Sequence, residues 1–336
     1  MKAPLSLHYV VLLNVSLTLV ALGMAIMSLR FGYVPLPASD VLAGLLGSAD
    51  EKIVTIIRDL RLPRTILALL IGAATGLAGA VLQSLLRNPL AEPSVVGITG
   101  GASLGAVIAL YFGLSAVFPF ALPLSALTGA AIATIVLYLV AARDSSTLTL
   151  ILVGMAIGGI SLSLISLAMN LSPNPWAVSE IIFWLLGSVR DRSFADVTLA
   201  APFIVTGIAV LLTLGKPLDA LSLGEEAAQS LGMDLTRVRV LAIVGTSLAV
   251  GASVAVAGTI GFVGLVVPHL LRPLVGQMPS RLLLPSALGG AALLAAADVV
   301  VRLITVGPEL HLGIVTSLIG APFFLYLILK TRKIVR

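Results

Sequence analysis

Ten runs of apolar residues, separated by short polar segments, constrain this 336-residue chain more than any other feature. About 20 apolar residues suffice to cross a bilayer as one helix, and the backbone polar groups must then be satisfied within the segment. The runs lie at about 9–33, 63–86, 94–112, 121–142, 147–170, 196–214, 240–257, 259–271, 282–306 and 313–329. The sequence therefore predicts an all-α, polytopic membrane protein of about ten transmembrane helices.

The overall composition agrees with a membrane protein. Charged residues make up 10% of the chain, hydrophobic residues 59%, and the mean hydropathy is +1.14. A soluble domain of this length needs more charge to cover its surface, so we expect one transmembrane domain over 1–336. The net charge of +5 is spread over loops and tails, which favours anionic lipid as a partner and not nucleic acid. Cysteine is absent, which excludes disulfides and thiolate metal sites.

The first and eighth runs affect the number of crossings. Lys2 followed by an apolar run resembles a signal peptide, but the run from Tyr9 to Met27 is longer than a signal core, and no small-residue cleavage site follows it. We therefore expect an uncleaved first helix. The eighth run, 259–271, is short and begins among glycines. It is either a half-crossing or a segment that leans on the seventh, so nine and ten crossings both remain open.

The distribution of Lys and Arg indicates the orientation. A basic cluster at 330–336 favours cytoplasmic N- and C-termini, although the bias is modest and the outer side is unusually basic. This orientation places a polar stretch at about 34–62 outside. Pro and Ser-Asp turn signals within it predict a short helix that starts near Val41.

A second polar stretch, at about 215–239, is expected in the cytoplasm. Leu223, Ala227 and Leu231 recur every four residues within it, acidic residues precede them, and Gly232 supplies a stop. These features predict a short amphipathic helix. Its exposed apolar stripe favours protein docking over a solvated connector.

Signatures of catalysis are missing from the sequence. It contains no His-Glu-x-x-His metal motif, no Gly-x-Ser-x-Gly nucleophile elbow and no phosphate-binding loop, because Lys216 is followed by Pro217. We expect a transporter subunit with no catalytic residue, no metal site and no cofactor of its own. If ATP drives it, another chain binds the ATP and magnesium.

Only two ionisable residues lie clearly inside an apolar run. Asp298 and Arg302 are spaced i, i+4, which allows a local ion pair or a proton or ion relay. Glycines and a proline at membrane depth, within 258–269, indicate either a transport pathway or tight packing.

Several motifs together resemble the FecCD family, the permease subunits of type II ABC importers for ferric siderophores, haem and vitamin B12. The resemblance spans roughly residues 55–330. The first helix and the outer loop carry no motif that is specific to the family. The motifs are Arg61-Leu62-Pro63-Arg64-Thr65, Arg87-Asn88-Pro89-Leu90-Ala91-Glu92-Pro93, Leu223-Gly224-Glu225 with Leu231-Gly232, Gly261-Phe262-Val263-Gly264-Leu265-Val266-Val267-Pro268-His269 and Leu318-Ile319-Gly320-Ala321-Pro322-Phe323.

The resemblance implies a ten-helix permease fold and a set of partners. The permease would form a homodimer or a paralogous heterodimer in a bacterial inner membrane, with two cytoplasmic ATPase subunits and one external binding protein. It would move an iron chelate, either a ferric siderophore or haem, into the cytoplasm by alternating access. Vitamin B12 (cobalamin) is the alternative cargo.

The resemblance also assigns roles to residues. The cytoplasmic gate would comprise Asn88, Leu90, Thr147 and Leu148, although Asn88-Pro89 is also compatible with a plain turn. The residues that contact the ATPase would be Leu223, Gly224, Glu225, Ala228, Leu231 and Gly232.

On the outer side, Arg61 and Arg302 would receive glutamates of the binding protein. Such pairs give orientation and fast encounter, which would explain the basic outer side. Arg61 is also compatible with snorkelling to the headgroups, and Arg302 with pairing to Asp298 alone. His311, at the pathway mouth, is a candidate transient ligand of haem iron.

Two other functional classes compete with an importer permease. A secondary transporter needs no ATPase, but a proton-coupled carrier usually contains more buried acids than this chain has. An intramembrane transferase needs an acidic metal-binding cluster, and the acids here are scattered. Both classes are less compatible with the sequence than an ATP-driven importer.

Overall fold

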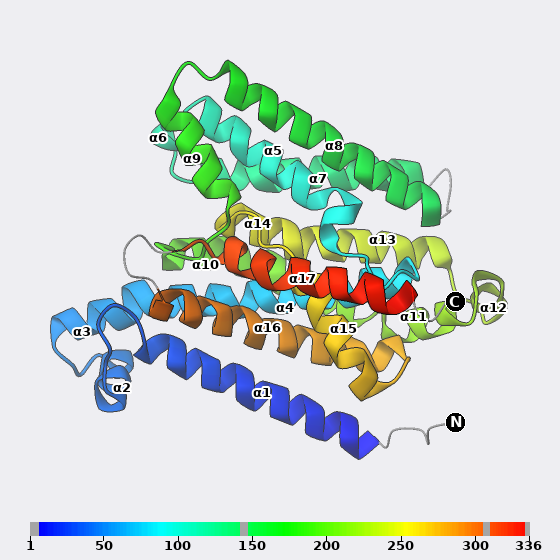
Figure 1. Cartoon of the computed structure of the whole chain (residues 1–336), viewed down its shortest axis with the longest axis horizontal. Coiled ribbons are helices and arrows are strands. Elements are labelled where there is room, and N and C mark those ends of the chain that lie inside the picture. The colour runs from blue at the N-terminus through cyan, green and yellow to red at the C-terminus, as the bar shows by residue number, and fades with distance from the viewer. Residues whose placement is uncertain (1–6, 142–146, 305–309, 333–336) are drawn as a thin grey trace.

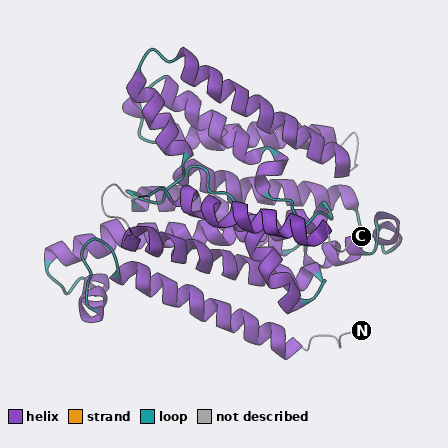
Figure 2. Ribbon diagram, viewed as in Figure 1, coloured by secondary structure: helices purple, strands orange, loops and turns teal. Residues whose placement is uncertain are grey.

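The computed structural model describes residues 7–141, 147–304 and 310–332, and every regular element in these ranges is helical (Figures 1 and 2). The all-α prediction is therefore confirmed. The elements are α1 (Leu7–Arg30), α2 (Ala38–Leu46), α3 (Glu51–Thr55), η1 (Ile56–Arg61), α4 (Leu62–Leu85), η2 (Pro93–Val96), α5 (Ile98–Tyr111), α6 (Leu114–Val117), α7 (Ala121–Ala141), α8 (Thr147–Leu171), α9 (Pro175–Leu185), α10 (Phe194–Leu212), α11 (Gly215–Ser222), α12 (Glu225–Ser230), α13 (Leu235–Thr246), η3 (Ser247–Gly251), α14 (Ala252–Ala257), α15 (Val263–Val275), α16 (Pro279–Ile304) and α17 (Leu312–Arg332).

Seven helical segments of the described chain are long and apolar enough to cross a membrane. They are His8–Arg30, Glu51–Leu85, Ala121–Val140, Leu148–Leu171, Phe194–Leu212, Leu235–Ala257 and Pro279–Ile304. Shorter apolar helical segments accompany them, namely α5, α9, α15 and the part of α17 from Leu312 to Tyr326. Each of the ten predicted runs overlaps one of these helices, and α9 lies outside all ten runs. The prediction of a polytopic membrane protein is confirmed, with an approximate number of spans.

The eighth run is the short α15. Its 13 residues extend about 20 Å, which is less than the roughly 30 Å of a bilayer core. An irregular segment from Gly258 to Gly261 separates it from α14, and Phe262, at its N-terminus, has a left-handed backbone with φ +66°. Alone, α15 is therefore only a partial crossing.

The predicted outer loop at about 34–62 is wrong in its second half. The expected short helix exists as α2, but α3, η1 and α4 form one continuous 35-residue helix from Glu51. The second apolar run begins only at residue 63, so the residues before it were assigned to the polar stretch. In the structure, a π-helical turn (η1) precedes Pro63, and such wider turns occur within α-helices without ending them.

Helix α4 is the centre of the bundle and packs along α16 and α15. Glycines make this packing possible. A Cβ added at Gly72 would lie 2.3 Å from the carbonyl oxygen of Gly290, and one at Gly76 would lie 2.3 Å from that of Ser286. Small residues let backbones approach in this way where no hydrophobic effect drives helices together.

The helices have two ends that matter for function (Figure 1). One carries α2, α3 and the loop between α9 and α10, and is called the α2–α3 end. The other, called the α11–α12 end, carries α11 and α12, the start of α1 at Leu7 and the end of α17 at Arg332. The beginning of the first helix and the end of the last therefore lie on one side of the bundle.

Candidate functional site

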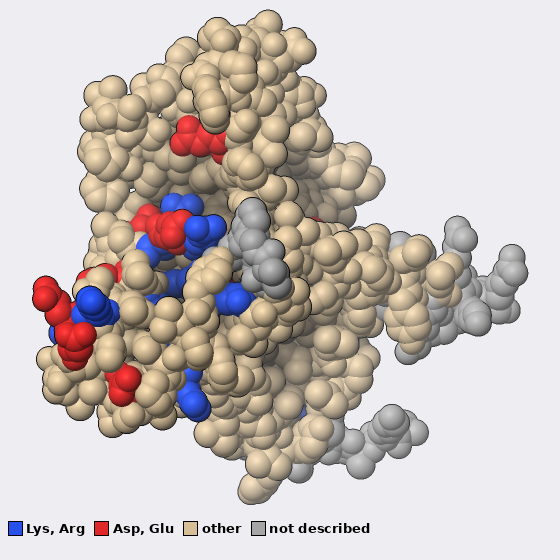
Figure 3. Space-filling view, turned by 60° about the vertical axis from the view of Figure 1, so that its left-hand side comes forward, with Lys and Arg blue, Asp and Glu red and all other residues tan. Residues whose placement is uncertain are grey.

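A pocket of about 530 Å³ lies at the α2–α3 end, and we call it the arginine pocket. Figure 3 shows charged side chains gathered over one part of this face, while most of the visible surface is uncharged. Five arginines and two aspartates are among the lining residues, which are Gly32, Tyr33, Val34, Ile56, Asp59, Leu60, Arg61, Arg64, Arg190, Asp191, Arg192, Ser193 and Arg302. The excess of arginine makes the pocket suited to an acidic group.

A buried ion triad forms the floor of the arginine pocket. Asp298, on α16, is 1% exposed, and its two carboxylate oxygens accept from Arg64 and Arg302, each at 2.7 Å. The predicted pair of Asp298 and Arg302 therefore exists, and Arg64 from α4 joins it, which the i, i+4 spacing of the pair does not indicate. Three charged groups buried together are stabilised only because each pairs within the cluster or with the backbone.

Arg61 and Arg302, the two predicted docking residues, lie together in the arginine pocket and are each 7% exposed. Arg61 donates to the carbonyl oxygens of Leu29 (2.7 Å) and Arg30 (2.9 Å), and also to that of Val34. Both arginines therefore hold the C-terminal end of α1 and the chain that follows it. Arg302 does so through the carbonyl oxygens of Ser28 (2.9 Å) and Phe31 (3.1 Å).

The loop between α9 and α10 adds two more arginines to the pocket. Arg190 forms an exposed ion pair with Asp191 at 3.1 Å. Arg192 is half-buried, and its Nε is buried without a hydrogen-bond partner among the described residues. Burial lowers the pKa of Arg192 from its usual value, and the carboxylates of Asp196 and Asp191 oppose that shift.

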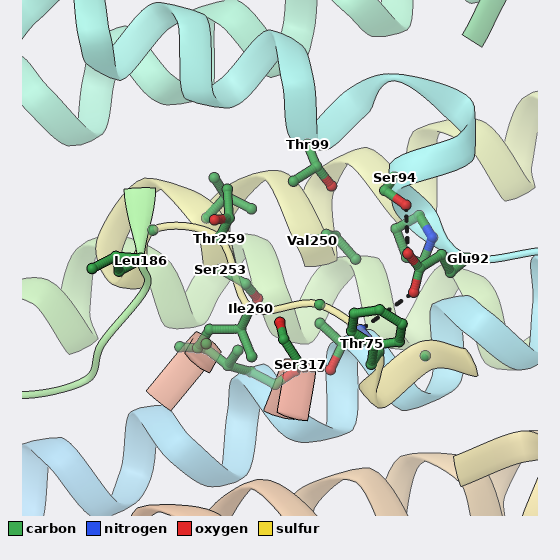
Figure 4. Close-up of a pocket in the computed structure, with 18 of the residues that line it drawn as sticks. Thr75, Glu92, Ser94, Thr99, Leu186, Val250, Ser253, Thr259, Ile260 and Ser317 are labelled. Carbon is green, nitrogen blue, oxygen red and sulfur yellow. Dashed lines mark hydrogen bonds between the residues drawn. The ribbon is translucent and has the colours of Figure 1, made fainter. Parts of the chain in front are cut away.

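A cavity of about 730 Å³, called the central cavity, lies along α4, α14, α15 and α17 (Figure 4). Its lining combines apolar groups with the hydroxyls of several Ser and Thr residues and one carboxylate. The lining residues are Ile71, Thr75, Glu92, Pro93, Ser94, Thr99, Leu185, Leu186, Val250, Ser253, Val254, Gly258, Thr259, Ile260, Gly261, Phe262, Gly264, Gly313, Ile314, Ser317, Leu318, Ala321 and Pro322. Pockets that take up small molecules are mostly apolar with a few polar groups, and the central cavity has this composition.

Glu92 joins two loops at one end of the central cavity (Figure 4). Its carboxylate accepts from the Ser94 hydroxyl at 2.6 Å and from the backbone N–H of Phe262 at 3.3 Å. The segment after α4 is thereby connected to the start of α15. Each bond to a carboxylate contributes about 1.5–3 kcal/mol.

We expect Glu92→Ala to lower the melting temperature of the purified permease in detergent by several degrees, because both bonds are lost. Glu92→Gln keeps one acceptor oxygen and should lose about half as much. Asp59→Asn, a change of an exposed acid at the opposite end, is the matched control and should leave the melting temperature unchanged. Equal melting curves for Glu92→Ala and the control would contradict a structural link through Glu92.

The α11–α12 end presents the predicted ATPase-contact residues. A short helix, α12, is present in the predicted stretch and ends before Gly232, but its six residues leave out Leu223 and Leu231 of the predicted apolar stripe. Leu223 and Leu231 flank α12 and are 69% and 60% exposed, so each offers an apolar side chain to a partner. Gly224 separates α12 from α11 with φ +122°, a conformation that favours glycine.

Two of the predicted ATPase-contact residues make contacts within the permease itself. Ala228 is fully buried, and the half-exposed Glu225 pairs with buried Arg239 at 2.9 Å. Glu225 and Ala228 therefore fix α12 on α13, and the exposed leucines are left as the outward-facing members of the set.

The predicted gate residues lie in two separate segments. Asn88 forms a turn in which its side-chain oxygen accepts from the N–H of Leu90 at 2.9 Å, and both side chains are half-buried. Thr147 and Leu148 begin α8, where Leu148 is exposed. Asn88, Leu90 and Leu148 are not among the residues that line the central cavity, although Glu92 and Ser94 from the loop after α4 are.

His311 lies just before α17 and is half-buried. Its ring stacks on that of Phe183 in α9, with centroids 5.6 Å apart and planes 10° from parallel. It is not part of the central cavity lining. The ring is therefore held by an aromatic neighbour outside the cavity.

Sequence reasoning missed Arg64, Glu92 and Arg192 as site residues. Arg64 and Glu92 stood within the family motifs, but their partners, Asp298 and Phe262, are 234 and 170 positions away. Arg192 was counted only as part of an unusually basic outer side. A carboxylate between prolines, as at Glu92, was the one local signal that was available.

The sequence has clear relatives among known transporters. It is 39% identical over 313 residues to the uncharacterized ABC transporter permease protein YvrB of Bacillus subtilis. The aligned residues make up 90% of this chain and 88% of YvrB. It is 42% identical over 275 residues to the vitamin B12 import system permease protein BtuC of Salmonella typhimurium. The aligned residues make up 82% of this chain and 83% of BtuC. A solved metal-chelate type ABC transporter in an inward-facing conformation has a TM-score of 0.84 and 33% identity, covering 94% of this chain and 98% of that one.

A polytopic helical bundle with these relatives is a transport permease of the ABC importer class. The chain belongs to the FecCD transport family, which it matches over residues 18–330. The match begins earlier than the expected residue 55, so most of the first helix and the outer segment are part of the family pattern. Permease subunits of this family are not enzymes themselves, and in bacteria they lie in the inner membrane.

Proposed function

We propose that this permease imports an iron chelate, a ferric siderophore or haem, which an external binding protein delivers and a separate ATPase drives. The central cavity carries this proposal. Its apolar and hydroxyl-lined wall includes glycines at 258, 261, 264 and 313, which leave backbone exposed to the cavity. A mostly apolar wall with a few hydroxyls and one carboxylate is the usual composition of a pocket that admits a small organic molecule.

The proposed assembly is a homodimer, or a paralogous heterodimer, with two ATPase subunits and one binding protein. The arginine pocket, with Arg61 and Arg302, would receive acidic side chains of the binding protein on the outer face. The α11–α12 end would meet the ATPase, which places the N- and C-termini in the cytoplasm. Asn88, Leu90, Thr147 and Leu148 would close the cytoplasmic side in alternating access.

Vitamin B12 import is the second candidate, since BtuC relatives are 42% identical to this chain. The decisive experiment uses the permease with its ATPase in liposomes and the cognate binding protein outside. Uptake of radiolabelled ferric hydroxamate, haem and cobalamin is measured with and without internal ATP. ATP-dependent uptake of an iron chelate supports the proposal. Uptake of cobalamin alone supports the second candidate, and ion-driven uptake without ATPase excludes both.

The proposed ATPase contact at the α11–α12 end leads to a testable prediction. Leu223→Ser with Leu231→Ser should abolish most ATPase binding, because two exposed apolar side chains in one contact are lost. Leu46→Ser, at a leucine that is 70% exposed at the other end, is the matched control. Co-purification with the ATPase measures binding, and melting curves check the fold. Full co-purification of the double variant would place the ATPase contact elsewhere.

A further inference from the structure

A proline interrupts the hydrogen bonding of α15, the short helix beside the central cavity. Pro268 has no backbone N–H, so it cannot donate to the carbonyl oxygen of Gly264, four residues earlier in the helix. Gly264 is buried, and its carbonyl oxygen lies against Gly79 of α4. A buried carbonyl without a donor is costly at membrane depth, so the interruption needs a replacement partner.

The side chain of Gln83, on α4, supplies that partner. It is 1% exposed, and its Nε2 donates to the carbonyl oxygens of Gly264 at 3.2 Å and Leu265 at 3.4 Å. Its Oε1 accepts from Nη2 of Arg272 at 2.9 Å. This orientation of the amide is the one that fits, since a carbonyl accepts and a guanidinium donates. Gly264 and Leu265 precede Pro268, whereas Arg272 follows it, so one amide joins the two halves of α15 across the proline.

The two ends of α15 belong to different regions of the permease. The start of the helix, at Phe262 and Gly264, lines the central cavity. The other end leads through a short connection to α16, where the N–H of Ser280 donates to the Asp219 carboxylate on α11 at 2.8 Å. Helix α11 ends directly before Leu223, one of the proposed ATPase contacts. Helix α15 therefore connects the region of the proposed ATPase contact with the cavity wall.

We infer, on the basis of the ATP-driven import proposed above, that Gln83 is a positioning residue that makes α15 move as one piece. A proline lets a helix bend, because one hydrogen bond of the helix is missing at that point. With the Gln83 amide in place, a displacement of the α15 end near α11 reaches the cavity wall. Without the amide, the helix bends at Pro268 and the displacement is lost there.

The first test uses the complete transporter, permease with ATPase, in liposomes with its cognate binding protein. The cargo is whichever of radiolabelled ferric hydroxamate, haem and cobalamin the unmodified transporter takes up. Gln83→Met keeps the length of the side chain but removes its donor and its acceptor. It should lower ATP-driven uptake about fivefold or more, the size of a typical coupling between sites, while the ATPase rate changes less than about twofold. Gln277→Met, at an exposed glutamine just after α15, is the matched control and should leave both rates unchanged.

A second substitution separates positioning from plain stability. Pro268→Ala restores an N–H that can donate to the carbonyl oxygen of Gly264, so α15 no longer depends on Gln83. Gln83→Met combined with Pro268→Ala should therefore regain most of the uptake, whereas a general loss of packing would add to the first defect. The inference is overturned by normal uptake in Gln83→Met, by equal losses of uptake and ATPase rate, or by a double variant as impaired as Gln83→Met alone.

A labelling experiment tests the same inference without cargo. The chain has no cysteine, so Ile260→Cys, on the cavity wall just before α15, gives the permease a single site for a membrane-impermeant maleimide. ATP should change the labelling rate at this site, and adding Gln83→Met should remove most of that change. An ATP effect that survives in Gln83→Met, or no ATP effect with Gln83 present, would overturn the role of Gln83. An ATP effect that depends on Gln83 in a transporter that imports no iron chelate would contradict the proposed function alone.

Discussion

Replacing Asp298 with Asn is expected to destabilise the folded permease by about 3–5 kcal/mol, the largest effect of any single polar change considered. The carboxylate is 1% exposed and accepts from Arg64 and Arg302 at 2.7 Å each. Without it, two guanidinium groups remain buried beside each other with no counter-charge between them. The expected result is low yield from membranes and a melting temperature in detergent that falls by more than ten degrees.

Two controls make the Asp298 prediction specific. Asp59→Asn neutralises an exposed acid near the same pocket and should leave the melting temperature within one or two degrees. Combining Asp298→Asn with Arg64→Leu removes one of the stranded charges and should recover part of the loss. A single variant as stable as the control would show that backbone carbonyls alone can hold the two arginines.

Hydropathy predicts much of this fold, because each membrane-spanning helix must be apolar along its whole length. The short α15 was also predicted, because the length of its apolar run is read directly from the sequence. The helical segment from Glu51 to Arg61 was not predicted, because it lies before the apolar run that begins at residue 63. In the structure this segment is helical and continuous with α4, so the helix begins at Glu51, before the apolar run. No local signal in the sequence distinguishes a loop from a helix here.

The partners of the site residues were less predictable than the helices. Asp298 and Arg302 were paired from their i, i+4 spacing, whereas Arg64 joins them from another helix. Whether the guanidinium of a given arginine is hydrogen-bonded within the protein depends on such contacts with residues distant in the sequence. Nothing in the sequence around Arg61 and Arg192 distinguishes them, yet Arg61 donates to three carbonyl oxygens and the Arg192 Nε has no hydrogen-bond partner in the described part of the chain.

The second large effect is expected from Gly79→Ala on α4. A Cβ at this position would lie 1.9 Å from the carbonyl oxygen of Gly264 and 2.6 Å from its Cα, both backbone atoms of α15. No rotamer change relieves such a contact, so α4 and α15 must separate. Overpacking of this kind costs about 3 kcal/mol, and the movement would also open the central cavity, which Gly264 lines.

The matched control is Gly23→Ala on α1, where an added Cβ would meet nothing within 4 Å. Since alanine favours a helix over glycine by about 1 kcal/mol, this variant should melt at the same temperature as the unmodified protein or slightly higher. Opposite shifts for the same substitution in two helices would show that close backbone contact, and not helix propensity, makes Gly79 necessary. Equal melting temperatures for both variants would mean that α15 moves away from α4 at little cost, as a partial crossing that shifts during transport would.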